Sequence, residues 1–372
     1  NALKEKLKIY DIDGYIVPKN DDYFTEYSKI NRLKIISNFS GSAGLAVILN
    51  NKNYLFTDGR YTIQSQIESG KNFNIINYEK IINCNLFKNL TLGIDPKLIT
   101  YHQAKTFFLK NNKIKFINKN LIDEITKKKI KDDFPFFSLS KDIVGESYTS
   151  KINKISKYLK KNKSDYLFIS APENVAWILN IRGGDGPNSP MPNCRLIISK
   201  NKKLILISNI KKTKNLIKEK IINYNELINI EDFSKKIIQL KGNNFIIDNK
   251  SCSVYFENII KSKFKIIKRK DPTYLLKAIK NKIEIKNMIN THIIDGAALT
   301  KFIYWIKNTN KKKIDEVQAQ NKLEKFRKMN KNYLYPSFNT IAGTGSNGAI
   351  IHYRATKKIS KVIKKNEIFL CD

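Results

Sequence analysis

Residues 337–372 read SFNTIAGTGSNGAIIHYRATKKISKVIKKNEIFLCD and hold the densest cluster of chemically informative side chains in the chain. Gly343, Gly345 and Gly348 fall at the spacing G-x-G-x-x-G, which alone suggests a dinucleotide-binding turn or the phosphate-covering loop of a kinase. A dinucleotide-binding turn needs a helix directly after it, but residues 349–353 form a β-branched, apolar run that predicts a strand. A kinase loop needs a catalytic lobe after it, and too few residues follow for one. Both interpretations are therefore disfavoured.

A second apolar run, residues 368–371, predicts a strand that ends at Asp372. A carboxylate at the mouth of a buried strand is costly to desolvate unless it is paired or bound to a cation, so Asp372 is a candidate metal ligand. A solvated chain end is the alternative. Because domains rarely end on an apolar strand without a polar tail, we expect the chain to be truncated at Asp372. Asn1 in place of Met suggests the same at the other end.

The segments GTGSNGAIIHYR (343–354) and FLCD (369–372) resemble the start of the metal site of aminopeptidase P. This family comprises the Xaa-Pro aminopeptidases of the pita-bread metallopeptidase family M24. The resemblance implies that His352 is the active-site histidine and that Asp372 is the first metal ligand. The other ligands of the family are a second Asp, a His and two Glu further along, and none of these lies in this chain.

Earlier segments carry the same resemblance. DGYIVP (13–18), FSGSAG (39–44) and TDGRY (57–61) resemble the N-terminal domain of aminopeptidase P. AWILNIRGGD (176–185) resembles the second domain of the three-domain form, which also suits the length of 372 residues. The resemblance implies an α/β (α+β) fold class, with two similar creatinase-like α/β domains followed by the first part of a pita-bread catalytic domain.

The expected boundaries are residues 1–135, 136–272 and an incomplete 273–372. Hydrophobic periodicity and turn residues predict the elements within them. They are strands 13–18, 44–50, 54–57 and 73–78 with helix 61–69, then, after a linker at 132–147, helices 151–161 and 213–221 with strands 166–169, 195–198, 204–207, 245–248 and 264–267. Because a hairpin, a helix and a strand recur in the same order, we expect a structural duplication.

The third part opens with two helices. Residues 281–308 place apolar side chains three or four positions apart and predict one continuous apolar stripe. Asp315 and Glu316 suit the N-terminus of a second helix that runs to about residue 329. Two helices leading to a loop-and-strand metal site match the opening of the pita-bread fold.

The resemblance also implies a mechanism. Two divalent ions, usually manganese in this family, share carboxylate ligands, hold a bridging water and polarise the scissile carbonyl. His352 lies close enough to donate to the developing oxyanion or to move a proton. The implied substrates are proline-containing peptides, whose Xaa-Pro bond lacks an N–H, and family members are commonly homodimers.

Three positions depart from the family pattern. Asn339 stands where Asp is usual, which weakens a contact behind the metal ligands. Ser346 and Ala355 stand where Pro is often found, which changes loop stiffness. None of these departures removes a ligand.

The formal net charge of +36 raises the question of nucleic acid or an anionic membrane as partner. Only seven of the 69 basic residues are arginines, whereas base and phosphate readers favour the bidentate fork of Arg. Lysine also rises together with Asn and Ile along the whole chain. We therefore predict a solvated lysine surface, and neither nucleic acid nor membrane as a partner.

Cysteine spacing indicates no metal site or disulfide framework, since Cys84, Cys194, Cys252 and Cys371 form no C-x-x-C pair. A reducing cytoplasm suits this usage. No apolar run is long enough to span a bilayer, and the N-terminal NALKEKLKIYD has no apolar signal core.

Other chemically suggestive residues have structural explanations. Asp58 and Arg60 are expected to form a turn with a local ion pair. Arg182 and Asp185, in a Gly/Pro-rich loop, could hold a carboxylate or an amine, but an ion pair that fixes a long turn is favoured. His102 and His292 lack carboxylate or Cys partners in the sequence and are expected to be packed or surface residues.

The favoured function is that of an N-terminal fragment of a manganese-dependent Xaa-Pro aminopeptidase, a cytoplasmic metallopeptidase. The fragment is expected to be inactive by itself, because one carboxylate cannot hold two ions. The alternatives are a pita-bread pseudopeptidase that acts as a protein-binding module, and a creatinase-like C–N hydrolase. A nucleic-acid binder driven by charge is a third, for which binding should fall steeply with salt.

Overall fold

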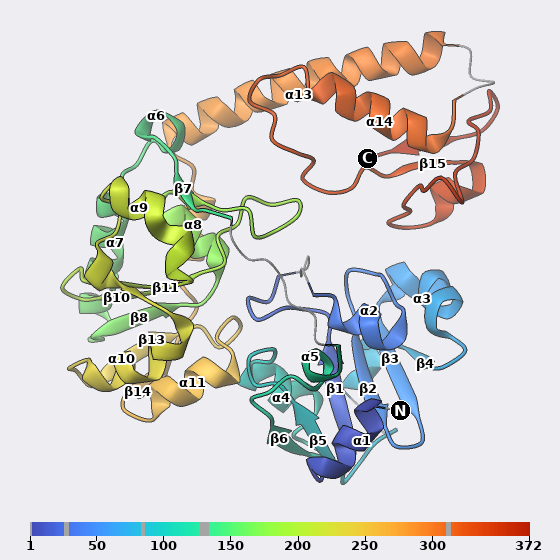
Figure 1. Cartoon of the computed structure of the whole chain (residues 1–372). Coiled ribbons are helices and arrows are strands. Elements are labelled where there is room, and N and C mark those ends of the chain that lie inside the picture. Colours follow the sequence, from blue (N-terminus) through green and yellow to red (C-terminus); the bar gives the residue numbers. More distant parts are fainter. Residues whose placement is uncertain (1, 26–29, 83–85, 127–133, 310–313) are drawn as a thin grey trace. The chain divides into compact units, whose positions relative to one another are not determined.

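The computed structural model describes residues 2–25, 30–82, 86–126, 134–309 and 314–372. The chain divides into two compact units, Asn1–Ile279 and Lys280–Asp372. The first unit contains two six-stranded sheets with helices packed on their faces, and the second contains two helices and a two-stranded sheet (Figure 1).

The first sheet has the strand order β4-β3-β2-β1-β5-β6. Its strands are β1 (Gly14–Pro18), β2 (Leu45–Leu49), β3 (Asn53–Thr57), β4 (Asn74–Asn77), β5 (Thr91–Ile94) and β6 (Lys113–Phe116), and its helices are α1 (Ala2–Ile9), α2 (Arg32–Ser37), α3 (Thr62–Ser69), α4 (Tyr101–Phe107) and α5 (Leu121–Thr126). Successive side chains of a strand point to opposite faces. Tyr15 and Val17 therefore pack with α1, α2 and α5, whereas Ile16 packs with Ala104 of α4.

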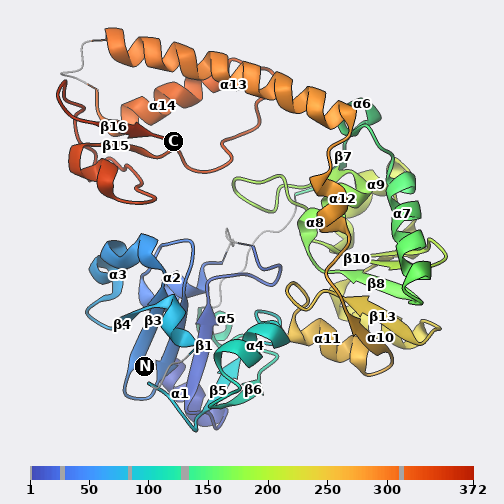
Figure 2. The ribbon, with the colours of Figure 1, turned by 180° about the vertical axis from the view of Figure 1, so that it is seen from behind.

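The second sheet has the order β12-β11-β10-β8-β13-β14. Figure 2 labels its central strands β10, β8 and β13. Its strands are β8 (Tyr166–Ile169), β10 (Arg195–Ser199), β11 (Leu204–Ile207), β12 (Leu227–Ile228), β13 (Asn244–Ile247) and β14 (Lys265–Lys268), and its helices are α7 (Tyr148–Lys161), α8 (Pro172–Leu179), α9 (Lys214–Lys218), α10 (Phe233–Gln239) and α11 (Val254–Lys261). Leu167 and Ile169 pack with α7 and α8, and Phe168 packs with α10 and α11. Shorter elements of this unit are β7 (Phe137–Ser138), β9 (Ile181–Arg182), α6 (Lys141–Val144) and α12 (Thr273–Ala278).

The two sheets have the same topology. In the first, β1, β2 and β3 pair antiparallel, while β5 joins β1, β6 joins β5 and β4 joins β3 in parallel. In the second sheet, β8, β10 and β11 likewise pair antiparallel, while β13 joins β8, β14 joins β13 and β12 joins β11 in parallel. The expected duplication and the α/β fold class are therefore confirmed.

In the first unit, two expected segments differ from the structure. The helix predicted at 213–221 ends at Lys218, because Lys220 adopts a left-handed backbone with φ 55° that stops a helix. The predicted linker at 132–147 contains β7, which pairs with β9, and α6. Its first two residues lie outside the described residues.

The second unit is built on α13 (Lys282–Asn308) and α14 (Glu316–Arg327), followed by β15 (Ala342–Thr344) and β16 (Phe369–Cys371). Both helices begin with a capping box, at Asn281 and Asp315, which explains where they start. Arg327 of α14 donates two hydrogen bonds to Asp295 of α13, at 2.7 and 3.1 Å. This bidentate pair and a small apolar core around Phe302 and Leu323 hold the helices together.

The apolar stripe expected on α13 is only partly covered. Ala298 and Phe302 are buried, but Ile289 and Ile293 are 54% and 65% exposed. The spacing therefore predicted the helix correctly, while most of its apolar face has no cover from the described residues.

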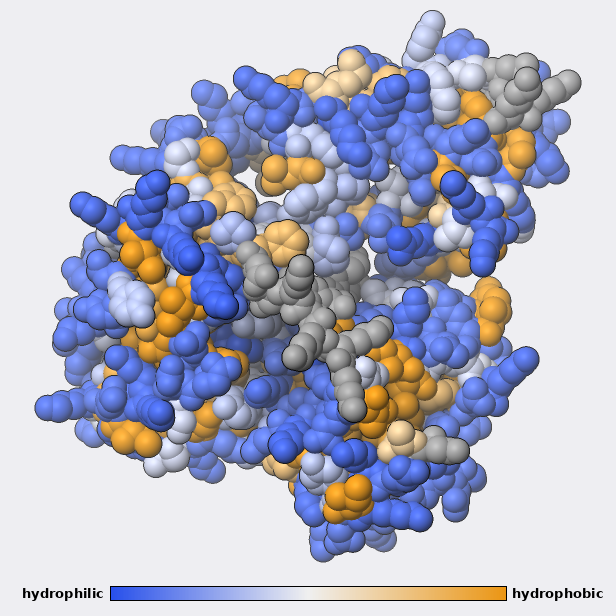
Figure 3. Space-filling view, in the orientation of Figure 1, coloured by the Kyte–Doolittle hydropathy of each residue, from blue (hydrophilic) through white to orange (hydrophobic). Residues whose placement is uncertain are grey.

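The surface is dominated by polar side chains. The face in Figure 3 is mainly hydrophilic, with separate apolar patches, as the many lysines lead one to expect. Among the described residues, no helix is long and apolar enough to cross a bilayer.

Asp95, directly after β5, is a buried carboxylate with few partners. The residue is 4% exposed. Its carboxylate accepts hydrogen bonds from the Lys97 N–H at 2.9 Å and from Asn120 Nδ2 at 3.1 Å. Burial raises the pKa of Asp95 from 3.8 to about 6, and the charge of Asp22 adds to this. The native state therefore holds this proton more tightly than the unfolded chain.

Because of this raised pKa, we expect the free energy of unfolding to decrease as the pH rises from the lower to the higher of the two pKa values. As pH rises from 3.8 to about 6, the unfolded carboxyl loses its proton first, so the free energy of unfolding decreases. Asp95→Asn should relieve a cost of about 2–3 kcal/mol at pH 7 and little at pH 4. Urea unfolding at both pH values measures this, with exposed Asp11→Asn as the control. An equal gain at both pH values would contradict it.

Candidate functional site

The glycine segment folds back on β15. Residues Gly345–Ala349 form a 3₁₀ turn, and Gly345 has φ +53°, in the left-handed region that favours glycine. A side chain at Gly343 would meet the backbone nitrogen of Gly348 at 2.9 Å. Two of the three glycines are therefore needed for this turn, and neither a dinucleotide fingerprint nor a kinase loop is present, because no helix or strand follows directly.

The strand predicted at 349–353 is wrong. Ala349 ends the 3₁₀ turn, and Tyr353 N–H donates to the Ile350 carbonyl at 3.1 Å, which makes a tight turn. His352 within it has φ +56°, a left-handed backbone that cannot continue a strand. A strand also needs a partner for its backbone groups, and no strand pairs with this segment in the described part of the chain. The β-branched composition alone misled the prediction.

The two predicted site residues, His352 and Asp372, lie on segments that are joined through the β15–β16 pair. His352 is exposed on the turn after the glycine segment. Asp372 is also exposed and directly follows β16, so the strand predicted at 368–371 is confirmed. The backbone of Asp372 exchanges two hydrogen bonds with Ile341, at 2.8 and 2.9 Å. Asp372 therefore lies opposite the residue that precedes β15, on the strand that neighbours the glycine segment.

The described residues do not by themselves fit a metal centre. No group of three or more His, Cys, Asp and Glu side chains gathers closely enough among them to hold a metal ion. Asp372 contributes one carboxylate, whereas hard divalent cations take several oxygen ligands. Asp372 therefore remains a predicted ligand, and no further His, Cys, Asp or Glu donors gather around it among the described residues.

A buried polar cluster beside the turn was not predicted. Glu316, the first residue of α14, is fully buried, and Asn347 and Tyr353 are nearly so. Tyr353 O–H donates to Glu316 at 2.8 Å, and Asn347 Nδ2 donates to both Glu316 oxygens at 3.0 and 3.1 Å. Burial, together with its bond to Glu316, raises the pKa of Tyr353. In the sequence Glu316 could be assigned only to a helix N-terminus, because its partners lie more than 25 residues away.

The ion pair predicted between Arg182 and Asp185 is wrong. Asp185 pairs instead with Lys212 at 2.7 Å, and both side chains are buried. Arg182 donates to the backbone carbonyls of Ala176 and Ile181. The loop is thus fixed by an ion pair, but with a partner 27 residues away that no local pattern reveals.

The remaining candidates are structural. Asp58 caps a short helix and pairs with Arg60 at 2.8 Å, as expected for a turn. His102 and His292 are exposed, and His292 Nδ1 lies 2.9 Å from the Met288 carbonyl oxygen.

The described cysteines are not expected to be reactive nucleophiles, because burial disfavours their thiolate form. Cys194, Cys252 and Cys371 are free thiols, and burial raises the pKa of each. Cys84 lies outside the described residues.

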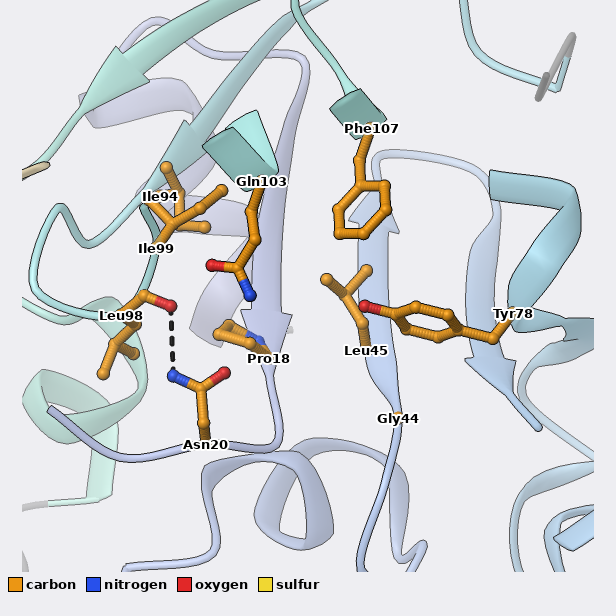
Figure 4. Close-up of a pocket in the computed structure, with 10 residues that line it drawn as sticks. All are labelled: Pro18, Asn20, Gly44, Leu45, Tyr78, Ile94, Leu98, Ile99, Gln103 and Phe107. Atoms are coloured by element: carbon orange, nitrogen blue, oxygen red, sulfur yellow. Dashed lines mark hydrogen bonds between the residues drawn. The ribbon is translucent and has the colours of Figure 1, made fainter. Parts of the chain in front are cut away.

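Two cavities differ in the size of the ligand that each could hold. In the first sheet domain, Tyr78 and Gln103 point into a cavity of about 40 Å³, beside Asn20, whose Nδ2 donates to the Leu98 carbonyl at 3.1 Å (Figure 4). This space suits a few water molecules and is too small for an organic ligand. In the second unit, Arg354 and Asn339 line a cavity of about 290 Å³, which is large enough for a small ligand. Arg354 follows His352 by two positions in the sequence.

Three family models match the chain. The creatinase/prolidase N-terminal domain matches residues 1–124 and, in a second form, 127–284, and metallopeptidase family M24 matches 286–372. The two creatinase/prolidase matches fall on the two sheets of equal topology. The M24 match contains the glycine segment, His352 and Asp372.

Relatives are similar over nearly the whole chain. Xaa-Pro aminopeptidase 1 of Dictyostelium discoideum is 32% identical over all of this chain and 63% of its own length. Xaa-Pro aminopeptidase ApepP of Drosophila melanogaster is 31% identical over 97% of this chain and 62% of its own length. The chain thus spans about three-fifths of the length of these relatives.

A solved structure has the same fold. It is an X-prolyl aminopeptidase from Caenorhabditis elegans, described as a cytosolic enzyme with a di-nuclear active site, which superposes with a TM-score of 0.87. The superposition covers 97% of this chain and 63% of that one, at 22% sequence identity. At this identity the likeness establishes the fold alone.

Proposed function

We propose that the protein carrying this chain is an Xaa-Pro aminopeptidase of the aminopeptidase P family, because the chain matches the creatinase/prolidase N-terminal domain twice and metallopeptidase family M24 once, and because relatives of 31% and 32% identity are Xaa-Pro aminopeptidases. It removes the N-terminal residue from peptides with proline in second position. The observation that carries this proposal is the similarity to Xaa-Pro aminopeptidases along the entire chain.

The proposal assigns two residues. Asp372 is a ligand of divalent metal ions, expected to be manganese, and the family's other ligands are absent from these 372 residues. The M24 match and the di-nuclear site of the Caenorhabditis elegans enzyme support a pair of ions, which when bound supply an activated water. The proposal also includes three domains, at 1–135, 136–272 and 273–372, a homodimer and a cytoplasmic location.

The second assigned residue is His352, which acts on the substrate carbonyl. It is exposed on a turn, so its imidazole can reach a bound peptide. A neighbouring imidazole can stabilise a developing oxyanion or move a proton. The glycines before it leave room for the peptide backbone to approach the turn.

The direct test is hydrolysis of matched peptides. The whole protein should release the first residue of an Xaa-Pro-Yaa peptide at least ~100-fold faster than that of Xaa-Ala-Yaa, because a pocket shaped for proline excludes other residues. A chelator should remove the activity, and Mn²⁺ should restore it.

The other outcomes decide against the proposal. Binding of proline peptides without cleavage would favour a protein-binding module. Cleavage of creatine-like C–N bonds without peptide cleavage would favour the related hydrolase.

A further inference from the structure

Glu316 organises the segment that carries His352. One carboxylate oxygen, Oε1, accepts from the Thr344 N–H at 2.8 Å, and the other, Oε2, accepts from the Lys361 N–H at 3.1 Å. Asn347 and Tyr353 complete the set with side-chain donors. All four partners belong to residues 344–361, which begin at the glycine segment and pass through His352.

The burial of Glu316 makes these bonds necessary. The residue has no exposed surface, and it forms no ion pair with Lys or Arg in the described part of the chain. A buried carboxylate without a cation is strongly destabilising unless hydrogen bonds and a helix N-terminus replace its water. The position of Glu316 at the start of α14 supplies the helix N-terminus, and the 344–361 segment supplies the donors. The segment is therefore held around the carboxylate.

His352 depends on this arrangement through its neighbour. Its left-handed backbone, φ +56°, is sparsely populated for a residue with a side chain and persists only where the surroundings fix it. Tyr353, the next residue, is buried and bonded to Glu316 at 2.8 Å. Asn347, five residues before His352, is bonded to the same carboxylate. The turn is thus fixed on both sides of the histidine by one side chain.

We propose that Glu316 is a positioning residue, which sets the orientation of His352 and of the glycine turn without contacting the substrate. The assignment rests on the proposed function in one respect, that His352 acts on the substrate. The hydrogen-bond geometry around Glu316 is independent of that function.

The test compares Glu316→Gln with Glu316→Asp. Glutamine has the same shape but replaces one accepting oxygen with an NH₂ group, which points at donors. Aspartate keeps the charge. In the whole protein, Glu316→Gln should lower kcat about 100-fold with KM changed less than about threefold, because a catalytic group displaced by about 1 Å loses rate rather than affinity. Glu316→Asp should restore part of kcat, and Lys325→Gln, exposed on the same helix, should leave both constants unchanged.

A second readout does not need activity. Diethyl pyrocarbonate modifies imidazoles, and the chain has three, His102, His292 and His352. Mass spectrometry should show a several-fold change in the modification rate at His352 in Glu316→Gln, with the other two rates unchanged. A similar change at all three would mean general unfolding and would overturn the positioning role.

The two proposals fail in different ways. Wild-type modification rates and wild-type kcat in folded Glu316→Gln would overturn the role of Glu316 while leaving the peptidase proposal intact. A selective change at His352 in a protein that never cleaves Xaa-Pro peptides would support the role of Glu316 and count against the proposed function.

Discussion

If the whole protein has the proposed metal-dependent peptidase activity, replacing Asp372 with alanine is expected to abolish it. Metal ions contribute several kcal/mol to such reactions, so kcat/KM should fall about 1,000-fold or more. The fold should survive, because the bonds that Asp372 makes with Ile341 use only its backbone and its side chain is exposed. Peptide hydrolysis and metal content per protein, measured on the same sample, test this expectation.

The control for Asp372 is a carboxylate of similar exposure elsewhere. Glu5→Ala, on the exposed side of α1, should change neither activity nor metal content. If Asp372→Ala keeps wild-type activity, Asp372 is not a ligand, and the metal assignment in this chain has no remaining residue.

Replacing Lys212 with methionine is expected to destabilise the first unit by about 3–5 kcal/mol, because the buried carboxylate of Asp185 loses the cation that lies 2.7 Å from it. The two groups are almost fully inaccessible to water. Asp185 also accepts a hydrogen bond from the Asn193 N–H at 2.6 Å, so the loop that carries it should loosen as well. Urea unfolding followed by circular dichroism measures the loss.

A double variant separates charge from packing. Asp185→Asn with Lys212→Met removes both charges but keeps an acceptor for Asn193, so it should recover most of the lost stability. The surface pair Lys328 and Glu324 offers a matched comparison, and Lys328→Met should cost at most about 0.5 kcal/mol. A similar small loss for Lys212→Met would show that Asp185 is solvated when unpaired.

Part of each sheet could be predicted because the signals of those strands are local, whereas β5, β6 and β12 had no predicted counterpart. The hairpin of β2 and β3 and that of β10 and β11 join short apolar runs through polar turns, and both were located to within a few residues. The repeated order of elements also predicted that the two sheets would share a topology. Asp372 was placed correctly at the end of a strand, because an apolar run and its boundary are visible in sequence.

The predictions that were wrong concern residues whose conformation or partner is set by contacts with residues far away in the sequence. The run Ala349–Tyr353 has strand composition, but the conformation of His352 is set by a carboxylate 36 residues earlier in the chain. The Lys212 partner of Asp185 follows it by 27 residues, so proximity in sequence pointed to Arg182 instead. In both cases the partners of a buried charged side chain were missed, because composition and periodicity carry no information about such partners.

The lysine-rich composition has a consequence at the ends of the two sheets. The outermost strands are β4 and β6 in one sheet and β12 and β14 in the other. β4 and β14 present Asn or Lys at both ends, β6 alternates Lys with apolar residues, and β12 is only two residues long. Charged side chains and very short strands at such positions deter the addition of a further strand from another molecule. Lysine on β6 and β14 should therefore oppose aggregation through these two edges, and the shortness of β12 should do the same at its edge.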